Sequence, residues 1–265
     1  MGNPSEHQIA GIPYESVLAV EGLPDALTVS YLSGSLVAGY GNAWSDIDVY
    51  VVGDRKPIGE HVVAERGSLV SVHYEFCRRI DFEFWDSRTV SALSERLAAF
   101  RVGELVPDEY FSSGEEAFIH RLRIGVTTAD QTAALEKLRS PFDFELFRRY
   151  LIQKSLRWVD HLVEDVCGMV ESGDHLLSVV TARRMAGRAV DAYCHFRGST
   201  DSSLKWRLWH LERFSSDGSD EGIRERFLDL LFPPQSLKDG SPAASKEYTD
   251  TCLIFVNDVA TMVQR

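Results

Sequence analysis

The sequence predicts an α/β (α+β) domain with a short mixed sheet, followed by an all-α helical bundle. Apolar runs at 26–32, 47–52 and within 69–85 have the β-branched and aromatic bias of strands. Beyond about residue 125, apolar residues recur every three to four positions, the spacing of amphipathic helices. We therefore expect a first domain over residues 1–125 and a helical domain over residues 126–265.

The elements of the first domain follow in order. A strand over 26–32 leads into a loop and short helix, and a second strand follows over 47–52. Residues 54–67 are polar and predict a loop or short helix, and residues 69–85 then supply two more strands. The apolar residues within 87–100 have helical spacing, which predicts a helix that covers the sheet.

Helix signals dominate the second domain. Thr128 with Gln131 has the form of a capping box, and Ser140-Pro141 followed by Asp143 predicts another helix start. The periodicity then predicts two long helices, one through 147–170 and one over 176–196 that stops at Gly198, and shorter ones over 204–214, 222–232 and 245–263.

Composition excludes several classes of protein. The 265 residues include 28 Lys and Arg against 40 Asp and Glu, a formal charge of −12, which argues against a nucleic-acid partner. No apolar run is long enough to span a membrane, and the first 14 residues are too polar for a secretory signal, so we expect a cytoplasmic protein. The four cysteines are scattered, and we assign them neither disulfides nor zinc.

The most informative segment begins with Gly34-Ser35 at a strand end and continues, ten residues later, to Asp46-Ile47-Asp48 at the start of the next strand. Strand alternation places Asp46 and Asp48 on one face. Two carboxylates this close favour a divalent cation, and oxygen ligands with phosphate favour magnesium or manganese. Gly34 allows a phosphate to approach closely, and the Ser35 hydroxyl can donate a hydrogen bond to it.

This segment resembles the DNA polymerase β-like nucleotidyltransferase superfamily, whose pattern is Gly-Ser, a spacer of about ten residues, and Asp-x-Asp. The resemblance calls for a third carboxylate on a later strand. Asp81 and Glu83 both qualify, because both face the same way along that strand. Asp81 matches the family position better, since it stands early in the strand, just after an apolar residue.

A catalytic α/β domain followed by a helical bundle also resembles the antibiotic-type, small-molecule nucleotidyltransferases. The resemblance implies transfer of a nucleoside monophosphate, AMP from ATP, to a hydroxyl of a small-molecule acceptor, with release of pyrophosphate. Asp46, Asp48 and Asp81 would bind two Mg²⁺ (or Mn²⁺) ions, and Gly34 and Ser35 would hold the leaving phosphates. The segment 198–207 looks like a helix-connecting turn of such helical domains, which makes Lys205 a candidate triphosphate ligand.

Alternatives remain open at this stage. Nucleotidylylation of a protein partner, as in antitoxin-type members of the superfamily, uses the same motif, and a catalytically silent nucleotide sensor would also retain the fold. A general base on the helical domain has four candidates, each of which is better explained as a solvated charge on a helix face: Glu145, Asp160, Glu164 and Asp165. Tyr40 and Trp44 can stack on a base, although core packing explains both better. The sequence does not indicate the acceptor, the preferred base or the oligomeric state.

Overall fold

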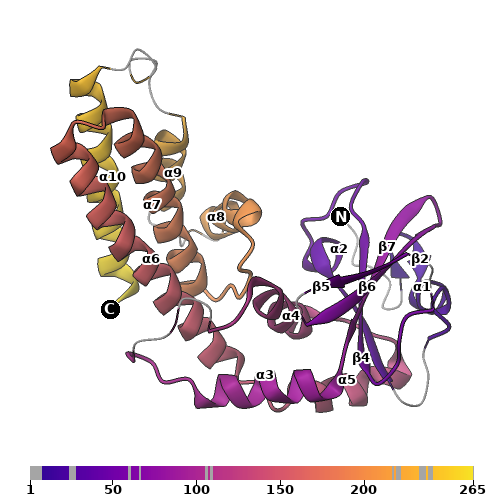
Figure 1. The fold of residues 1–265 in the computed structure, drawn as a ribbon. Coiled ribbons are helices and arrows are strands. Elements are labelled where there is room, and N and C mark those ends of the chain that lie inside the picture. Colours follow the sequence, from indigo (N-terminus) through magenta and orange to yellow (C-terminus); the bar gives the residue numbers. More distant parts are fainter. Residues whose placement is uncertain are drawn as a thin grey trace. The chain divides into compact units, whose positions relative to one another are not determined.

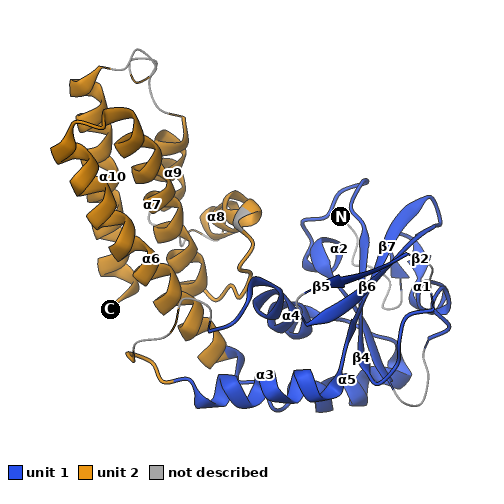
Figure 2. Ribbon diagram, viewed as in Figure 1, with its two compact units in different colours: residues 1–100, 109–144 blue, residues 101–108, 145–265 orange. Residues whose placement is uncertain are grey.

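The computed structural model describes residues 8–23, 28–58, 61–65, 67–104, 107, 110–216, 218, 222–232, 237 and 241–264. The chain divides into two compact units: residues 1–100 with 109–144 form unit 1, and residues 101–108 with 145–265 form unit 2 (Figure 2). The described part of unit 1 holds a mixed sheet with flanking helices, and that of unit 2 is helical. This confirms the predicted fold class.

The sheet of unit 1 contains five strands in the order β3-β4-β7-β6-β5. The β4–β7 pair is parallel, and the other pairs are antiparallel. The strands are β3 (Thr28–Ser33), β4 (Ile47–Gly53), β5 (Val62–Glu65), β6 (Ser68–Glu75) and β7 (Arg78–Trp85). The predicted strand over 26–32 is thus present from Thr28, and residues 26 and 27 lie outside the described residues. The expectation of a loop or short helix over 54–67 is wrong for the stretch that forms β5, because this edge strand is exposed along its length and carries no burial pattern.

The two faces of the sheet differ in chemistry. One face is apolar, with Ile47, Val49 and Phe82 in a core that also includes Leu18 of α1 (Tyr14–Ala19). A two-stranded ribbon of β1 (Gln8–Ile9) and β2 (Ile12–Pro13) precedes α1. The opposite face carries the acidic residues of β4 and β7, so the helices that cover it enclose polar groups as well as aromatic rings.

Aromatic packing fills the centre of this second face. Tyr31 and Tyr50 stack with ring centroids 5.4 Å apart, and Trp85 lies 4.4 Å from Phe118. Phe118 belongs to α4 (Ser113–Ile124), which begins with a complete capping box between Ser112 and Glu115. The remaining helices of unit 1 are the short α2 (Gly34–Ala38), α3 (Ser87–Ala99) and α5 (Thr132–Arg139).

Two helix starts differ from the sequence prediction. The Thr128 side chain makes no capping hydrogen bond, and only a 3-10 turn over Ala129–Gln131 precedes α5. Ser140 ends α5 instead of starting the next helix, and α6 begins at Phe144. In both places the short motif is present, but the backbone turns before the helix begins.

Unit 2 consists, in its described part, of helices packed around one apolar core (Figure 1). The helices are α6 (Phe144–Ser172), α7 (His175–Phe196), α8 (Arg207–Ser216), α9 (Ile223–Leu231) and α10 (Pro242–Val263). The chain reverses between α6 and α7 at Gly173, whose φ of +79° favours glycine. None of the described helices is both long and apolar enough to cross a lipid bilayer.

Candidate active site

Gly34 forms the turn between β3 and α2 and has a φ of +84°. A Cβ atom added to Gly34 would lie 1.7 Å from Oδ2 of Asp48. The strand register explains this contact, because Ser33 at the end of β3 pairs with Asp48 in β4. Both the left-handed backbone and the approach of the carboxylate therefore require glycine at this position. Ser35 is the next residue of α2 and is buried.

Asp48 and Asp81 are direct neighbours across the parallel β4–β7 pair. Each stands between apolar residues that face the other side of the sheet, so both carboxylates lie on the same face. Asp46, just before β4, is close enough to raise the pKa of both. The structure therefore brings together the acids that the sequence motif singled out.

Asp48 carries the strongest electrostatic perturbation among these acids. Burial raises its pKa from 3.8 to about 7. The positive charge of Arg121 opposes this rise, whereas Asp46, Asp81 and Glu83 add to it. A cation bound at this place would stabilise the charged form of Asp48 and relieve the repulsion among the acids.

Asp81 forms a bidentate ion pair with Arg79, two residues earlier on the same strand. Arg79 Nε lies 2.7 Å from Oδ1, and its second terminal nitrogen lies 2.7 Å from Oδ2. Burial raises the pKa of Asp81, and the hydrogen bonds and charge of Arg79 partly offset this. Sequence analysis missed Arg79, although strand alternation already placed it on the face of Asp81.

Glu83 has a different environment from Asp81. Trp85 Nε1 donates a hydrogen bond of 2.7 Å to its carboxylate, and the side chains of Tyr50 and Ser68 also bond to it. Burial raises the pKa of Glu83, while these hydrogen bonds lower it. Three neutral partners thus hold Glu83 within the aromatic layer, which suits a structural role.

The residues at this site have the ligand chemistry of a divalent metal site, but their side chains are not arranged around one metal position. The carboxylates supply the hard oxygen ligands that Mg²⁺ prefers, and the repulsion at Asp48 favours an added positive charge. Among the described residues, however, no three His, Cys, Asp or Glu side chains are arranged to hold one metal ion. Arg79 balances the charge of Asp81 instead. Metal binding by Asp46, Asp48 and Asp81 together would require Asp81 to exchange this partner.

Tyr40 and Trp44, the two aromatic candidates for base stacking, have opposite environments. Tyr40 is buried, as core packing predicts. Trp44 is 95% exposed, so the expectation that it packs in the core is wrong. The reason is its position in the turn over 42–45, which is held by hydrogen bonds from the Trp44 N–H to Asn42 Oδ1 and from the Asn42 N–H to Ser45 Oγ.

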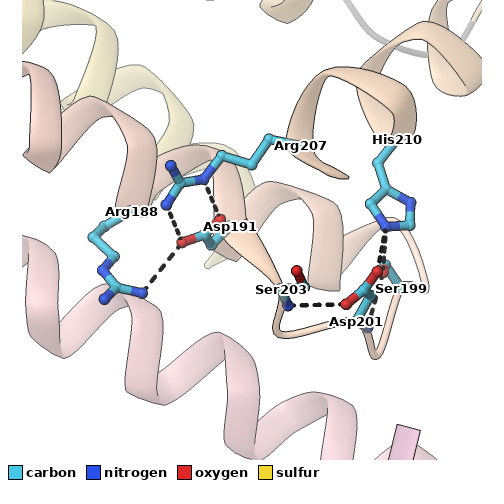
Figure 3. A network of polar contacts seen from close by, with 7 residues as sticks. All are labelled: Arg188, Asp191, Ser199, Asp201, Ser203, Arg207 and His210. Atoms are coloured by element: carbon cyan, nitrogen blue, oxygen red, sulfur yellow. Dashed lines mark hydrogen bonds and ion pairs between the residues drawn. The ribbon is translucent and has the colours of Figure 1, made fainter. Parts of the chain in front are cut away.

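Lys205 lies in unit 2, in the 3-10 turn Leu204–Trp206, where its Nζ is 4.9 Å from the Trp206 ring centroid. Figure 3 shows the polar network on both sides of this turn. Arg207 binds both oxygens of Asp191, at 2.5 and 2.8 Å, and Asp201 accepts a hydrogen bond of 2.9 Å from the Ser203 N–H. These contacts fix the segment between α7 and α8. A role for Lys205 in phosphate binding stays a prediction.

The four acids proposed as a general base lie on α6. Glu145 forms ion pairs with Arg148 and Arg149, which lower its pKa. The other three are exposed: Asp160, Glu164 and Asp165. Their environments are those of solvated charges on a helix surface.

Comparisons with known proteins give a distant likeness only. The sequence matches no family model and no curated protein. Among solved structures, it is similar to a nucleotidyltransferase-like protein from Exiguobacterium sibiricum, with a TM-score of 0.48 and 10% sequence identity over 94% of this chain and 74% of that chain. At this distance the likeness assigns no residue and no reaction to this chain.

Proposed function

We propose that this protein is a magnesium-dependent nucleotidyltransferase that moves AMP from ATP to a hydroxyl of a small-molecule acceptor and releases pyrophosphate. The observation that carries the proposal is the junction of Gly34, Asp48 and Asp81. A glycine with a left-handed backbone lies against one carboxylate, and that carboxylate has a second one beside it on the neighbouring strand. This arrangement buries like charges together, which lowers stability. Packing of the core therefore does not explain it.

Each residue of the site would have a distinct role in the transfer. Asp46, Asp48 and Asp81 would hold the magnesium ions, which neutralise the phosphates and stabilise charge on the entering and leaving oxygens. Gly34 leaves room for the β- and γ-phosphates, and Ser35 donates a hydrogen bond to them. Because burial raises the pKa of Asp48 to about 7, a cationic partner would increase its ionisation at neutral pH.

The transfer itself exchanges one phosphorus–oxygen bond for another. The acceptor hydroxyl oxygen forms a bond to the α-phosphorus, and the bond from that phosphorus to the bridging oxygen breaks. Pyrophosphate leaves with the bonding electrons, and the hydroxyl proton passes to a base at the site. Positioning and charge neutralisation supply most of the rate in this type of reaction.

One observation favours the silent nucleotide sensor as a second candidate. The ion pair with Arg79 occupies both oxygens of Asp81, the third acid of the proposed site. An arginine that stays there during nucleotide binding would keep Asp81 from a metal. The same fold would then bind nucleotide without turning it over.

The test incubates the protein with each labelled nucleoside triphosphate and MgCl₂, with and without a panel of hydroxylated metabolites, antibiotics and proteins. Pyrophosphate release and mass spectrometry report transfer. Release that depends on an acceptor and on magnesium, and that is lost in Asp48→Asn but kept in the exposed control Glu95→Gln, supports the enzyme. A mass increment on a protein favours nucleotidylylation of a partner. Nucleotide binding without pyrophosphate release over the whole panel contradicts the proposal and favours the sensor.

A further inference from the structure

A pocket of about 300 Å³ opens next to the acids. Its lining includes Ser45, the neighbour of Asp46, and Arg79, the partner of Asp81. The remaining walls come from the segment just before β4 and from the β6–β7 turn, so the pocket lies at the ends of β4, β7 and β6. An acceptor in this pocket would lie beside Asp46 and Asp81.

Two large aromatic side chains line the pocket and are left open to solvent. Trp44 is 95% exposed and Tyr74 is 76% exposed. Trp44 is supplied by the turn before β4, and Tyr74 by the end of β6, so they are distant in sequence. Exposed aromatic side chains that share a pocket are typical of ligand recognition, because a flat ring gains contact area with little loss of side-chain freedom.

The segments that carry these rings are fixed in place. Arg78 donates a hydrogen bond of 2.6 Å to the Ser45 carbonyl, which ties the β6–β7 turn to the turn before β4. Within the β6–β7 turn, Phe76 and Cys77 have φ values of +53° and +57°, a left-handed conformation that usually belongs to Asn and Gly. A strained turn of bulky residues beside a pocket is typical of functional sites.

The polar groups of the pocket are compatible with an aromatic ring. Arg79 is neutralised by both oxygens of Asp81, whereas Arg78 keeps its positive charge, because its hydrogen bond goes to the neutral Ser45 carbonyl, and it can add a cation–π contact to a bound ring. Asp46 and Asp81 lie at the same edge and would repel an anion. Stacking on aromatic faces requires only a π-system in the ligand.

We infer that the acceptor carries an aromatic ring, which packs against Trp44 and Tyr74 while its hydroxyl reaches the acids. This inference rests on the proposed function, because the ligand is an acceptor only if the protein catalyses transfer. Binding of an aromatic ring in the pocket is testable without catalysis. The inference also excludes purely aliphatic sugars and polyols as preferred acceptors.

The binding test uses 2-phenylethanol and 2-cyclohexylethanol, which differ in aromaticity at nearly equal size. Ligand-observed NMR titrations would measure both against the wild type, Trp44→Ala, Tyr74→Ala and the control Phe232→Ala. Phe232 is 75% exposed, which matches Tyr74, and it lies in unit 2. Because these rings are exposed, their removal leaves the fold intact, and thermal unfolding checks this.

We expect 2-phenylethanol to bind more tightly than 2-cyclohexylethanol, and Trp44→Ala to weaken it at least fivefold, as stacking on one aromatic face predicts. Tyr74→Ala should act in the same direction, and Phe232→Ala should have no effect. Equal binding of the two alcohols, or equal loss in Phe232→Ala and Trp44→Ala, overturns the inference.

A turnover test separates this inference from the proposed function. If transfer occurs, Trp44→Ala should raise the KM for the acceptor with little change in kcat. Transfer to a ring-free acceptor with an unchanged KM in Trp44→Ala refutes the inference and leaves the function standing. Absence of transfer to every acceptor, with ring binding that still depends on Trp44, refutes the function and leaves the aromatic pocket standing.

Discussion

Replacing Asp48 by Asn tests the electrostatic core of the candidate site. The substitution removes a charge at constant side-chain size, next to Asp46, Asp81 and Glu83, all of which raise the pKa of Asp48. Without metal, the ionised carboxylate destabilises the folded state, so we expect Asp48→Asn to be more stable than the wild type at neutral pH. A gain in stability from a substitution at a buried position is uncommon.

The magnitude follows from linkage. The pKa of Asp48 rises from 3.8 in the unfolded chain to about 7 in the fold. This group favours folding most below pH 4, and its contribution is lost as the pH rises from about 4 to about 7. At about 1.4 kcal/mol per pKa unit, Asp48→Asn should exceed the wild type by less than 1 kcal/mol at pH 4 and by up to about 4 kcal/mol at pH 8.

The assay is urea unfolding of the wild type, Asp48→Asn and the exposed control Glu95→Gln at pH 4, 6 and 8, first with EDTA. The series is then repeated with millimolar MgCl₂. Magnesium should stabilise the wild type at pH 8 by RT ln(1 + [Mg²⁺]/Kd), about 1.4 kcal/mol at ten times Kd, and should do little for Asp48→Asn. If the difference in unfolding free energy between the wild type and Asp48→Asn did not change with pH, the reasoning would be refuted. Equal stabilisation of both proteins by magnesium would also refute it.

Three further predictions concern neighbouring residues. Asp81→Asn should abolish pyrophosphate release, whereas Glu83→Gln should keep most of it, because Glu83 is bonded within the aromatic layer; steady-state turnover of both variants decides this, and thermal unfolding checks that both are folded. Gly34→Ala should lower the free energy of unfolding by about 3 kcal/mol, of which about 1–2 kcal/mol comes from the left-handed backbone and the rest from contact of the new Cβ with Asp48. Urea unfolding in an Asp48→Ala background should show only the backbone part. Cys77→Gly should stabilise the fold by about 1 kcal/mol, because glycine accepts the φ of +57° without strain; an unchanged or lower unfolding midpoint contradicts this.

Much of the candidate site follows from the sequence because its parts are local. Gly34, Asp48 and Asp81 each stand at a strand end or within an alternating strand, so a period of two places them on one face. The positions of Lys205 and of the acids on α6 relative to these residues depend on long-range packing of helices, which no short spacing encodes.

The missed elements have physical reasons as well. The six residues of α1 are too few to show a helical period, and the exposed strand β5 lacks alternation. The capping box of α4 was visible as Ser112 and Glu115, but it precedes a helix with a weak apolar stripe. Arg121 of that helix, which offsets the charge of Asp48, was missed for the same reason.

The parallel pairing of β4 with β7 has a consequence for the order of folding. The β3–β4 pair and the β5–β6–β7 meander can each form from neighbouring segments, whereas Asp48 meets Asp81 only when β4 and β7 join. Long-range pairing of this kind is slow, because the intervening loop must close first. Asp81 is thus kept apart from Asp46 and Asp48 until β4 and β7 pair, and the repulsion between them opposes that step. Refolding should accordingly be slowest at neutral pH in the absence of divalent ions. The acids of the candidate site would then also limit the rate of folding.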